Sequence, residues 1–99
     1  MDTQAEIVNF LTTHKQFLQK KYNISKIALF GSFARNEMTK ESDVDLLIEL
    51  DKNAKNIYDL KTALKNYLSN AFKRDVDLAS IKYLKPYAKN EILKDALYV

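Results

Sequence analysis

Apolar residues recur at helical spacing in three stretches of the chain. In residues 3–22, apolar side chains and His14 fall three or four positions apart, which predicts one amphipathic helix ending near Asn23. The same spacing predicts a second helix at about residues 56–72 and a last helix at 86–98, with Pro86 in its first turn. The side chains expected to face the core are Ile7, Phe10, Leu11, His14, Phe17 and Leu18, then Ile57, Leu60, Leu64, Tyr67, Leu68 and Ala71, and finally Ile92, Leu93, Ala96 and Leu97.

Three shorter stretches have the composition of β-strands. Residues 24–30 are rich in β-branched and aromatic side chains and run into the only glycine of the chain, Gly31. Residues 43–50 alternate between an apolar face and a partly acidic face. Residues 75–79 predict a third, shorter strand.

Element order and composition together predict one small domain of the α/β (α+β) class. A short helix at 32–35 and a polar loop at 36–42 join the first two strands, so the predicted order is α-β-(α)-β-α-β-α. The chain has 99 residues, 46% of them hydrophobic, and no repeat or linker, so we expect a single domain spanning 1–99. Cysteine is absent, which excludes disulfides and thiolate metal sites. Without a signal peptide or a long apolar run, the expected location is the cytoplasm, with no membrane contact.

The charge of the chain gives only weak support to nucleic-acid binding. The net charge is +3, and the only two arginines among the 16 basic residues are Arg35 and Arg74. Scattered lysines usually form a solvated surface, and lysine recognises phosphate with less geometric selectivity than arginine does. A nucleic-acid-binding module is therefore the least favoured of the functional hypotheses.

Asp43 and Asp45 form the first candidate chemical group. Because they are two residues apart in a strand, their side chains project from one face about 7 Å apart at the backbone. Such like charges repel each other, and carboxylate oxygens are ligands that Mg²⁺ prefers. Asp77 supplies a third carboxylate from another predicted strand, with Asp75 as a competitor on the same face. If the strands are neighbours, the three carboxylates can hold two Mg²⁺ ions about 3.5–4 Å apart.

Gly31 and Ser32 form the second candidate group. They lie where a predicted strand ends and a helix begins, and backbone N–H groups at such a position are free to bind an anion. Arg35 follows one helical turn later and can reach the same phosphate region with a planar charged group.

The segments LFGSFAR, SDVDLLIEL and RDVDLAS, with ten residues between Gly-Ser and Asp-Val-Asp, resemble the minimal nucleotidyltransferase (MNT) group of the DNA polymerase β-like nucleotidyltransferase superfamily. The resemblance implies a small mixed β-sheet flanked by helices on one side. It also implies that Gly31 and Ser32 hold the triphosphate of ATP. Asp43, Asp45 and Asp77 would bind Mg²⁺, and Asp77 would help to activate the acceptor hydroxyl.

Members of this group often work beside a small helical HEPN ribonuclease toxin, which the MNT protein adenylylates. The resemblance therefore implies transfer of AMP from ATP to a hydroxyl, expected to be a tyrosine, of a HEPN-type partner, which makes the chain an antitoxin. The chain lacks the C-terminal acceptor-binding domain of larger superfamily members, so the acceptor must come from a partner. A homo-oligomer stays open.

The alternative is an antitoxin that neutralises its partner by contact, without catalysis. Its motivation is a set of tyrosines that could form an interface, although each could equally be the rim of the core: Tyr58, Tyr83, Tyr87 and Tyr98.

Several polar residues are expected to have no chemical role. His14 has no second histidine with which to bind a metal, and Glu37 and Glu41 are expected to be solvated. Glu49 is less certain, because alternation places it on the face of Asp45. Asn36 stands where many relatives have glycine, and asparagine tolerates the left-handed backbone expected there.

Overall fold

The computed structural model describes all residues 1–99 and contains a four-stranded mixed sheet with the order β3-β2-β1-β4. The strands are β1 (Ile24–Phe30), β2 (Val44–Leu50), β3 (Val76–Ser80) and β4 (Leu97–Tyr98). β1 is antiparallel to both β2 and β4, and β2 is parallel to β3. The predicted fold class is confirmed, and β1 has the predicted bounds.

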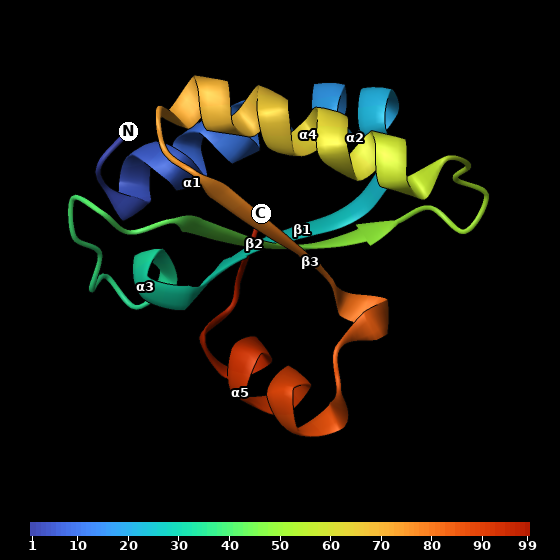
Figure 1. Ribbon diagram of the computed structural model, residues 1–99. Helices are drawn as coiled ribbons and strands as arrows, with labels where there is room; N and C mark the ends of the chain where they lie inside the picture. The colour runs from blue at the N-terminus through green and yellow to red at the C-terminus, as the bar shows by residue number, and fades with distance from the viewer.

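Three helices cover one face of this sheet. These are α1 (Gln4–Thr13), α2 (Lys15–Tyr22) and α4 (Ile57–Phe72), which lie together on one side in Figure 1. The short α3 (Gly31–Ala34) follows β1, while η1 (Ile81–Tyr83) and α5 (Pro86–Asp95) follow β3, with α5 on the other side of the sheet. No helix is long and apolar enough to cross a membrane.

The core lies between the sheet and the layer formed by α1, α2 and α4. Fifteen buried side chains form one cluster, to which α1, α2, α4, the short α3 and the three longer strands contribute. On β2, the alternating residues Val44, Leu46 and Ile48 point into this cluster. The acidic positions of the same strand therefore face the opposite side of the sheet.

The prediction of one helix over residues 3–22 is wrong, because the helix breaks at His14. The backbone of His14 leaves the helical region (φ −98°, ψ 8°), and its Nδ1 lies 2.9 Å from the carbonyl oxygen of Phe10. Its ring also stacks on that of Phe10, with centroids 4.0 Å apart. The break lets α1 and α2 approach the sheet separately, and Phe17, an expected core residue, stays 43% exposed.

The last predicted helix is also shorter than expected. α5 ends at Asp95, and Leu97–Tyr98 form β4 against the edge of β1. An uncovered strand edge has unpaired N–H and C=O groups, and pairing these outweighs another helical turn. No residue of α5 is fully buried, so the expected apolar stripe of this helix is only partly covered. Ile57 at the start of α4 was also expected in the core, but it is 41% exposed.

A capping box begins α1. The hydroxyl oxygen of Thr3 accepts from the backbone N–H of Glu6 at 3.1 Å, and the Glu6 carboxylate accepts from the N–H groups of Asp2 and Thr3 at 3.1 and 3.2 Å. These hydrogen bonds, led by the one from Asp2, lower the pKa of Glu6. The ionised carboxylate is thus favoured in the folded state.

We expect Glu6→Gln to destabilise the protein at neutral pH but not in acid. The folded-state pKa of Glu6 lies below its usual value of 4.5. The contribution of the Glu6 carboxylate to the free energy of unfolding is therefore present above about pH 4.5 and is lost as the pH falls through the folded-state pKa. Urea denaturation at about pH 7 and about pH 3 measures this difference. The matched control is Glu91→Gln, on exposed α5, which should change stability at neither pH; an equal loss for Glu6→Gln at both pH values contradicts the account.

Candidate active site

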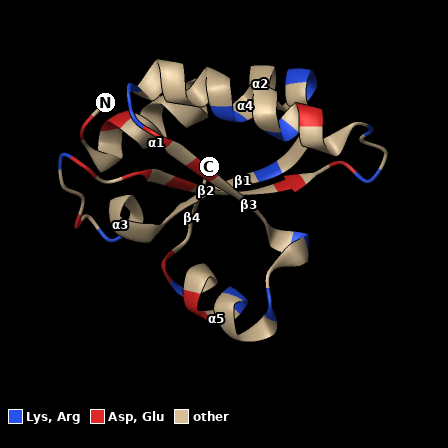
Figure 2. Ribbon diagram, viewed as in Figure 1, with Lys and Arg blue, Asp and Glu red and all other residues tan.

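Two acidic side chains meet where β2 and β3 pair. The parallel register places Asp45 beside Asp77, and Asp43 lies just before β2, two residues from Asp45. All three belong to the face of the sheet opposite the helical layer. Figure 2 shows acidic segments at the beginnings of both strands. The predicted pairing of Asp45 with Asp77 is therefore found, and Asp43 is near enough for its charge to act on Asp45.

The charges at this end of the sheet influence one another. The pKa of Asp45 is raised, mainly by burial and then by the negative charges of Asp77 and Asp43, while the positive charge of Arg35 opposes the shift. Asp75 is not among the causes: it is exposed, and its carbonyl oxygen accepts from the N–H of Val44 at 2.9 Å. Asp75 is thus a neighbour of the strand pair rather than a member of the group.

Gly31 brings the second motif into contact with the first. It has a left-handed backbone (φ 72°), and a Cβ atom added there would collide with the carboxylate oxygen Oδ2 of Asp45. The contact follows from the β1–β2 register, in which Phe30 pairs with Asp45. Because α3 begins at Gly31, the partly exposed Ser32 lies in a first helical turn directly next to the carboxylates.

Arg35 lies at the end of α3 and contacts two acidic groups. Its Nε is 3.2 Å from Glu37 Oε2, and its Nη1 is 4.0 Å from Asp95 Oδ2 at the end of α5. The side chain remains 44% exposed, so these surface ion pairs leave it free to exchange partners. Asn36 has the predicted left-handed backbone, with φ 59°.

Two residues that support the site were not predicted from the sequence. The guanidinium of Arg74 donates to backbone carbonyls of the loop before Asp43, including Ser42 at 2.9 Å. The side-chain amide of Gln4 donates to the carbonyls of Phe33 and Ala34 at 3.1 and 2.9 Å. Arg74 is one of only two arginines in the chain, and this rarity could have indicated a specific role for it. No pattern in the sequence distinguishes Gln4 from an ordinary surface residue.

The donor set suits a hard cation such as Mg²⁺. No group of three His, Cys, Asp or Glu side chains is placed to hold a metal ion by itself. Mg²⁺ is commonly bound by one or two carboxylates together with substrate phosphates, rather than by an all-protein cage. Asp43, Asp45 and Asp77 provide such carboxylates. Burial is the main cause of the raised pKa of Asp45, and a cation would offset the smaller contribution from the negative charges of Asp77 and Asp43.

Two surface hollows lie at opposite ends of β2. A polar hollow of about 730 Å³ is lined by Asp43, Arg74 and Asp75, with no hydrophobic side chain. A hollow of about 520 Å³ with an apolar wall lies beyond the end of β2 and contains none of the predicted site residues. Glu49 lines the second hollow and lies 3.9 Å from Lys26, away from the carboxylate group.

Known proteins share both the sequence and the fold of this chain. A family model described as a nucleotidyltransferase domain matches residues 11–99. A candidate protein adenylyltransferase of Methanocaldococcus jannaschii is 41% identical over the whole of both chains. Protein adenylyltransferase MntA of Thermococcus cleftensis is 31% identical over 100% of this chain and 98% of its own length.

Solved structures match in the same way. A candidate minimal nucleotidyltransferase superposes with a TM-score of 0.79 at 26% identity, over 98% of this chain and 95% of its own. At 18% identity the fold alone is shared with a chain from a complex of tri-AMPylated Shewanella oneidensis HEPN toxin with an MNT antitoxin. That match has a TM-score of 0.62 and covers 91% of this chain and 69% of the other.

Gly31→Ala should destabilise the protein by about 1–3 kcal/mol, because it adds left-handed strain to a collision with Asp45. Urea denaturation measures the loss. The double variant Gly31→Ala/Asp45→Ala separates the two causes, since removing the carboxylate should recover the collision part but leave the backbone part. Strictly additive effects would show that the Cβ does not meet Asp45.

Asp45→Asn should stabilise the free protein at neutral pH. A raised folded-state pKa means that the protonated form is favoured on folding, so this contribution is complete below the unfolded pKa, whose usual value is 3.8, and is lost as pH rises through the folded pKa. Removing the charge should therefore raise the melting temperature at about pH 7, measured without Mg²⁺ or nucleotide. Asp51→Asn, in an exposed position, is the control, and an equal gain there would refute the repulsion.

Proposed function

We propose that this chain, which belongs to the nucleotidyltransferase family, is a minimal, Mg²⁺-dependent enzyme that transfers AMP from ATP to a hydroxyl group of a partner protein. The observation that carries the proposal is the contact of Gly31 with Asp45, which stands beside Asp77 in the parallel register. The phosphate-binding turn and the metal-binding carboxylates are thereby adjacent. The whole chain, residues 1–99, serves as one nucleotidyltransferase domain, working in the cytoplasm.

The first turn of α3 receives the triphosphate. Backbone N–H groups from Gly31 onward and the Ser32 hydroxyl donate to phosphate oxygens, as the free donors of a helix start do. Arg35 exchanges its exposed contacts with Glu37 and Asp95 for the phosphates. When bound by the aspartates, two Mg²⁺ ions supply neutralisation of the triphosphate charge.

Asp77 receives the proton in the transfer step. The acceptor oxygen forms a bond to the α-phosphorus, the bond from that phosphorus to the β-phosphate oxygen breaks, and pyrophosphate leaves. The hydroxyl proton passes to the carboxylate of Asp77, which is exposed and therefore accessible to an acceptor from outside the chain. Asp43 and Asp45 hold the reacting groups in place, which in phosphoryl and nucleotidyl transfer supplies most of the catalysis.

The acceptor is a tyrosine hydroxyl of a HEPN-type toxin, and the chain is its antitoxin. Support comes from the relatives, which are named protein adenylyltransferases. Further support comes from the complex in which a chain of the same fold occurs together with an AMPylated HEPN toxin. The open face around Asp77 is consistent with an acceptor brought by a second protein.

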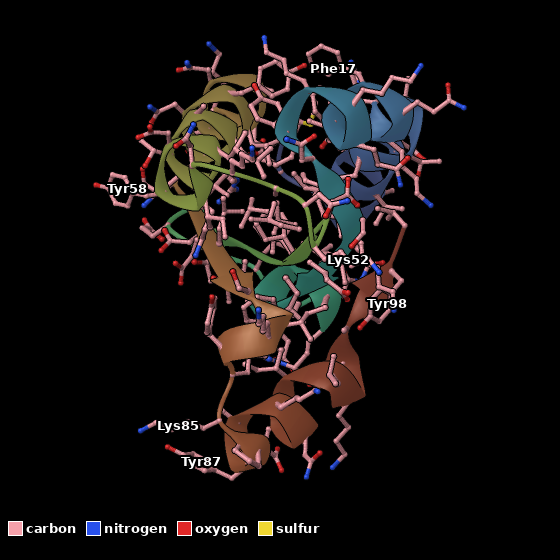
Figure 3. The ribbon with its side chains drawn as sticks, turned by 90° about the vertical axis from the view of Figure 1, so that its right-hand side faces the viewer. Phe17, Lys52, Tyr58, Lys85, Tyr87 and Tyr98 are labelled. Atoms are coloured by element: carbon pink, nitrogen blue, oxygen red, sulfur yellow. The ribbon has the colours of Figure 1, made fainter.

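A binding antitoxin is the second candidate, because the four tyrosines are exposed rather than part of the core rim. Their exposed fractions are 81% for Tyr58, 70% for Tyr83, 73% for Tyr87 and 54% for Tyr98. Figure 3 shows Tyr58 and Tyr87 projecting from α4 and α5. Aromatic side chains of this kind are common in protein interfaces. In this case the chain would neutralise its partner by contact, and catalysis would be dispensable.

Labelled ATP, Mg²⁺ and a HEPN-type toxin, incubated with this chain, test the two candidates. Wild type should transfer label to the toxin, and Asp43→Ala/Asp45→Ala should lose at least about a hundredfold in rate, because the charge neutralisation at the triphosphate is removed. Chelation of Mg²⁺ should have the same effect. Glu49→Gln, on the same strand but away from the carboxylates, should keep wild-type transfer.

Toxin activity, followed with and without ATP, separates catalysis from contact. If the double variant still binds the toxin but no longer neutralises it, occlusion alone is excluded. If wild type transfers no label, or the double variant transfers as much as wild type, the enzyme proposal is wrong. Full neutralisation by the double variant would establish the binding antitoxin.

A further inference from the structure

The ten residues between the Gly-Ser and Asp-Val-Asp motifs have little regular structure of their own. After the four residues of α3, the chain forms an exposed loop before β2 begins at Val44. Within this loop, the N–H of Glu37 donates to the carbonyl of Ser32 at 2.8 Å, and that of Thr39 donates to the Ser42 hydroxyl at 2.8 Å. These bonds are local, and apart from Met38, which packs against the core, the loop needs a further anchor to the rest of the fold.

Arg74 provides that anchor from a distant part of the sequence. Its Nη1 donates to three carbonyl oxygens of this one loop, at 3.0 Å to Thr39, 3.2 Å to Lys40 and 2.9 Å to Ser42. Its Nε donates to the Met1 carbonyl at 2.9 Å. Only 9% of the side chain is exposed, and its bonds to the Met1 and Ser42 carbonyls are partly buried, whereas those to Thr39 and Lys40 are exposed.

The same guanidinium also contacts α3, the helix that begins with Gly31 and Ser32. It lies over the ring of Phe33, with its central carbon 5.1 Å from the ring centroid, and Phe33 is the fully buried neighbour of Ser32 in α3. Arg74 itself stands two residues before β3, the strand that carries Asp77. One side chain therefore touches α3, the loop before Asp43 and the approach to β3.

We propose that Arg74 is a positioning residue that sets Asp43 relative to Ser32 and Asp77. A planar group with five N–H donors can hold several carbonyls and stack on an aromatic ring at once, whereas a lysine ammonium cannot reproduce this arrangement. The role rests on the proposed function, since Asp43 matters there as a metal ligand. Arg74 touches no reacting atom and acts only through the loop that it holds.

Arg74→Lys tests the inference because it keeps the charge and removes the planar group. Hydrogen exchange of residues 38–44 should become faster in the variant, while exchange in the remaining elements stays as in wild type. The Mg²⁺ concentration needed for half-maximal ATP binding, measured by calorimetry, should rise roughly tenfold to a hundredfold, as with other groups that orient metal ligands. ATP binding without Mg²⁺ should be unchanged.

Two control variants distinguish positioning from general destabilisation. Asp2→Ala removes only the exposed ion pair of Arg74, at 3.0 Å to an aspartate that is 85% exposed, and should leave both measurements as in wild type. Ile7→Val lowers stability from within the core, and it should leave exchange in 38–44 and the Mg²⁺ requirement unchanged.

The outcomes separate this inference from the proposed function. Unchanged exchange of 38–44 in Arg74→Lys, or an equal change in Ile7→Val, overturns the positioning role even if wild type adenylylates the toxin. An equal change in Asp2→Ala overturns the assignment to the backbone carbonyls. If wild type fails to adenylylate the toxin while Arg74→Lys shows both expected changes, the positioning role stands and the proposed acceptor is wrong.

Discussion

The parallel pairing of β2 with β3 is the constraint on which the rest of the structure depends. It places the carboxylates of Asp45 and Asp77 side by side, although their like charges repel. A parallel pair needs a long crossover, and α4 is that crossover. Because α4 packs with α1 and α2 on one face, the opposite, acidic face is covered only in part, by α5 and η1, and Asp77 stays exposed there.

Because the two faces of the sheet have different roles, a small domain can fold although its acidic site disfavours folding. The apolar face of the sheet and the three helices form a continuous core of 15 buried residues, which provides the burial that favours folding. On the opposite face, burial and neighbouring charge raise the pKa of Asp45, so the ionised form of this one carboxyl is disfavoured in the free protein. Perturbed carboxylates of this kind are common where a protein binds ligands or performs chemistry.

Several features could be predicted because they depend on neighbouring residues. The bounds of β1 follow from its run of β-branched and aromatic residues ending at glycine, and the left-handed Asn36 follows from the tolerance of asparagine for that conformation. The pairing of Asp45 with Asp77 was predicted only on the condition that their strands are neighbours, which the alternation of either strand alone does not decide. The functional roles of these residues stay predictions, although the two strands that carry Asp45 and Asp77 are neighbours.

The sequence by itself determined the residue types of the site, their spacing and the face of each strand on which they lie, since these follow from local periodicity and side-chain chemistry. Only the tertiary structure decided where the first helix breaks, because the helical spacing of apolar residues runs on through His14, and buried residues of both α1 and α2 join a core formed with distant elements. It likewise decided that Leu97–Tyr98 pair with β1, because the unpaired N–H and C=O groups on the edge of β1 belong to residues far away in sequence. The role of Arg74 has the same origin: the carbonyls that it binds are more than 30 residues distant, and only folding brings them together.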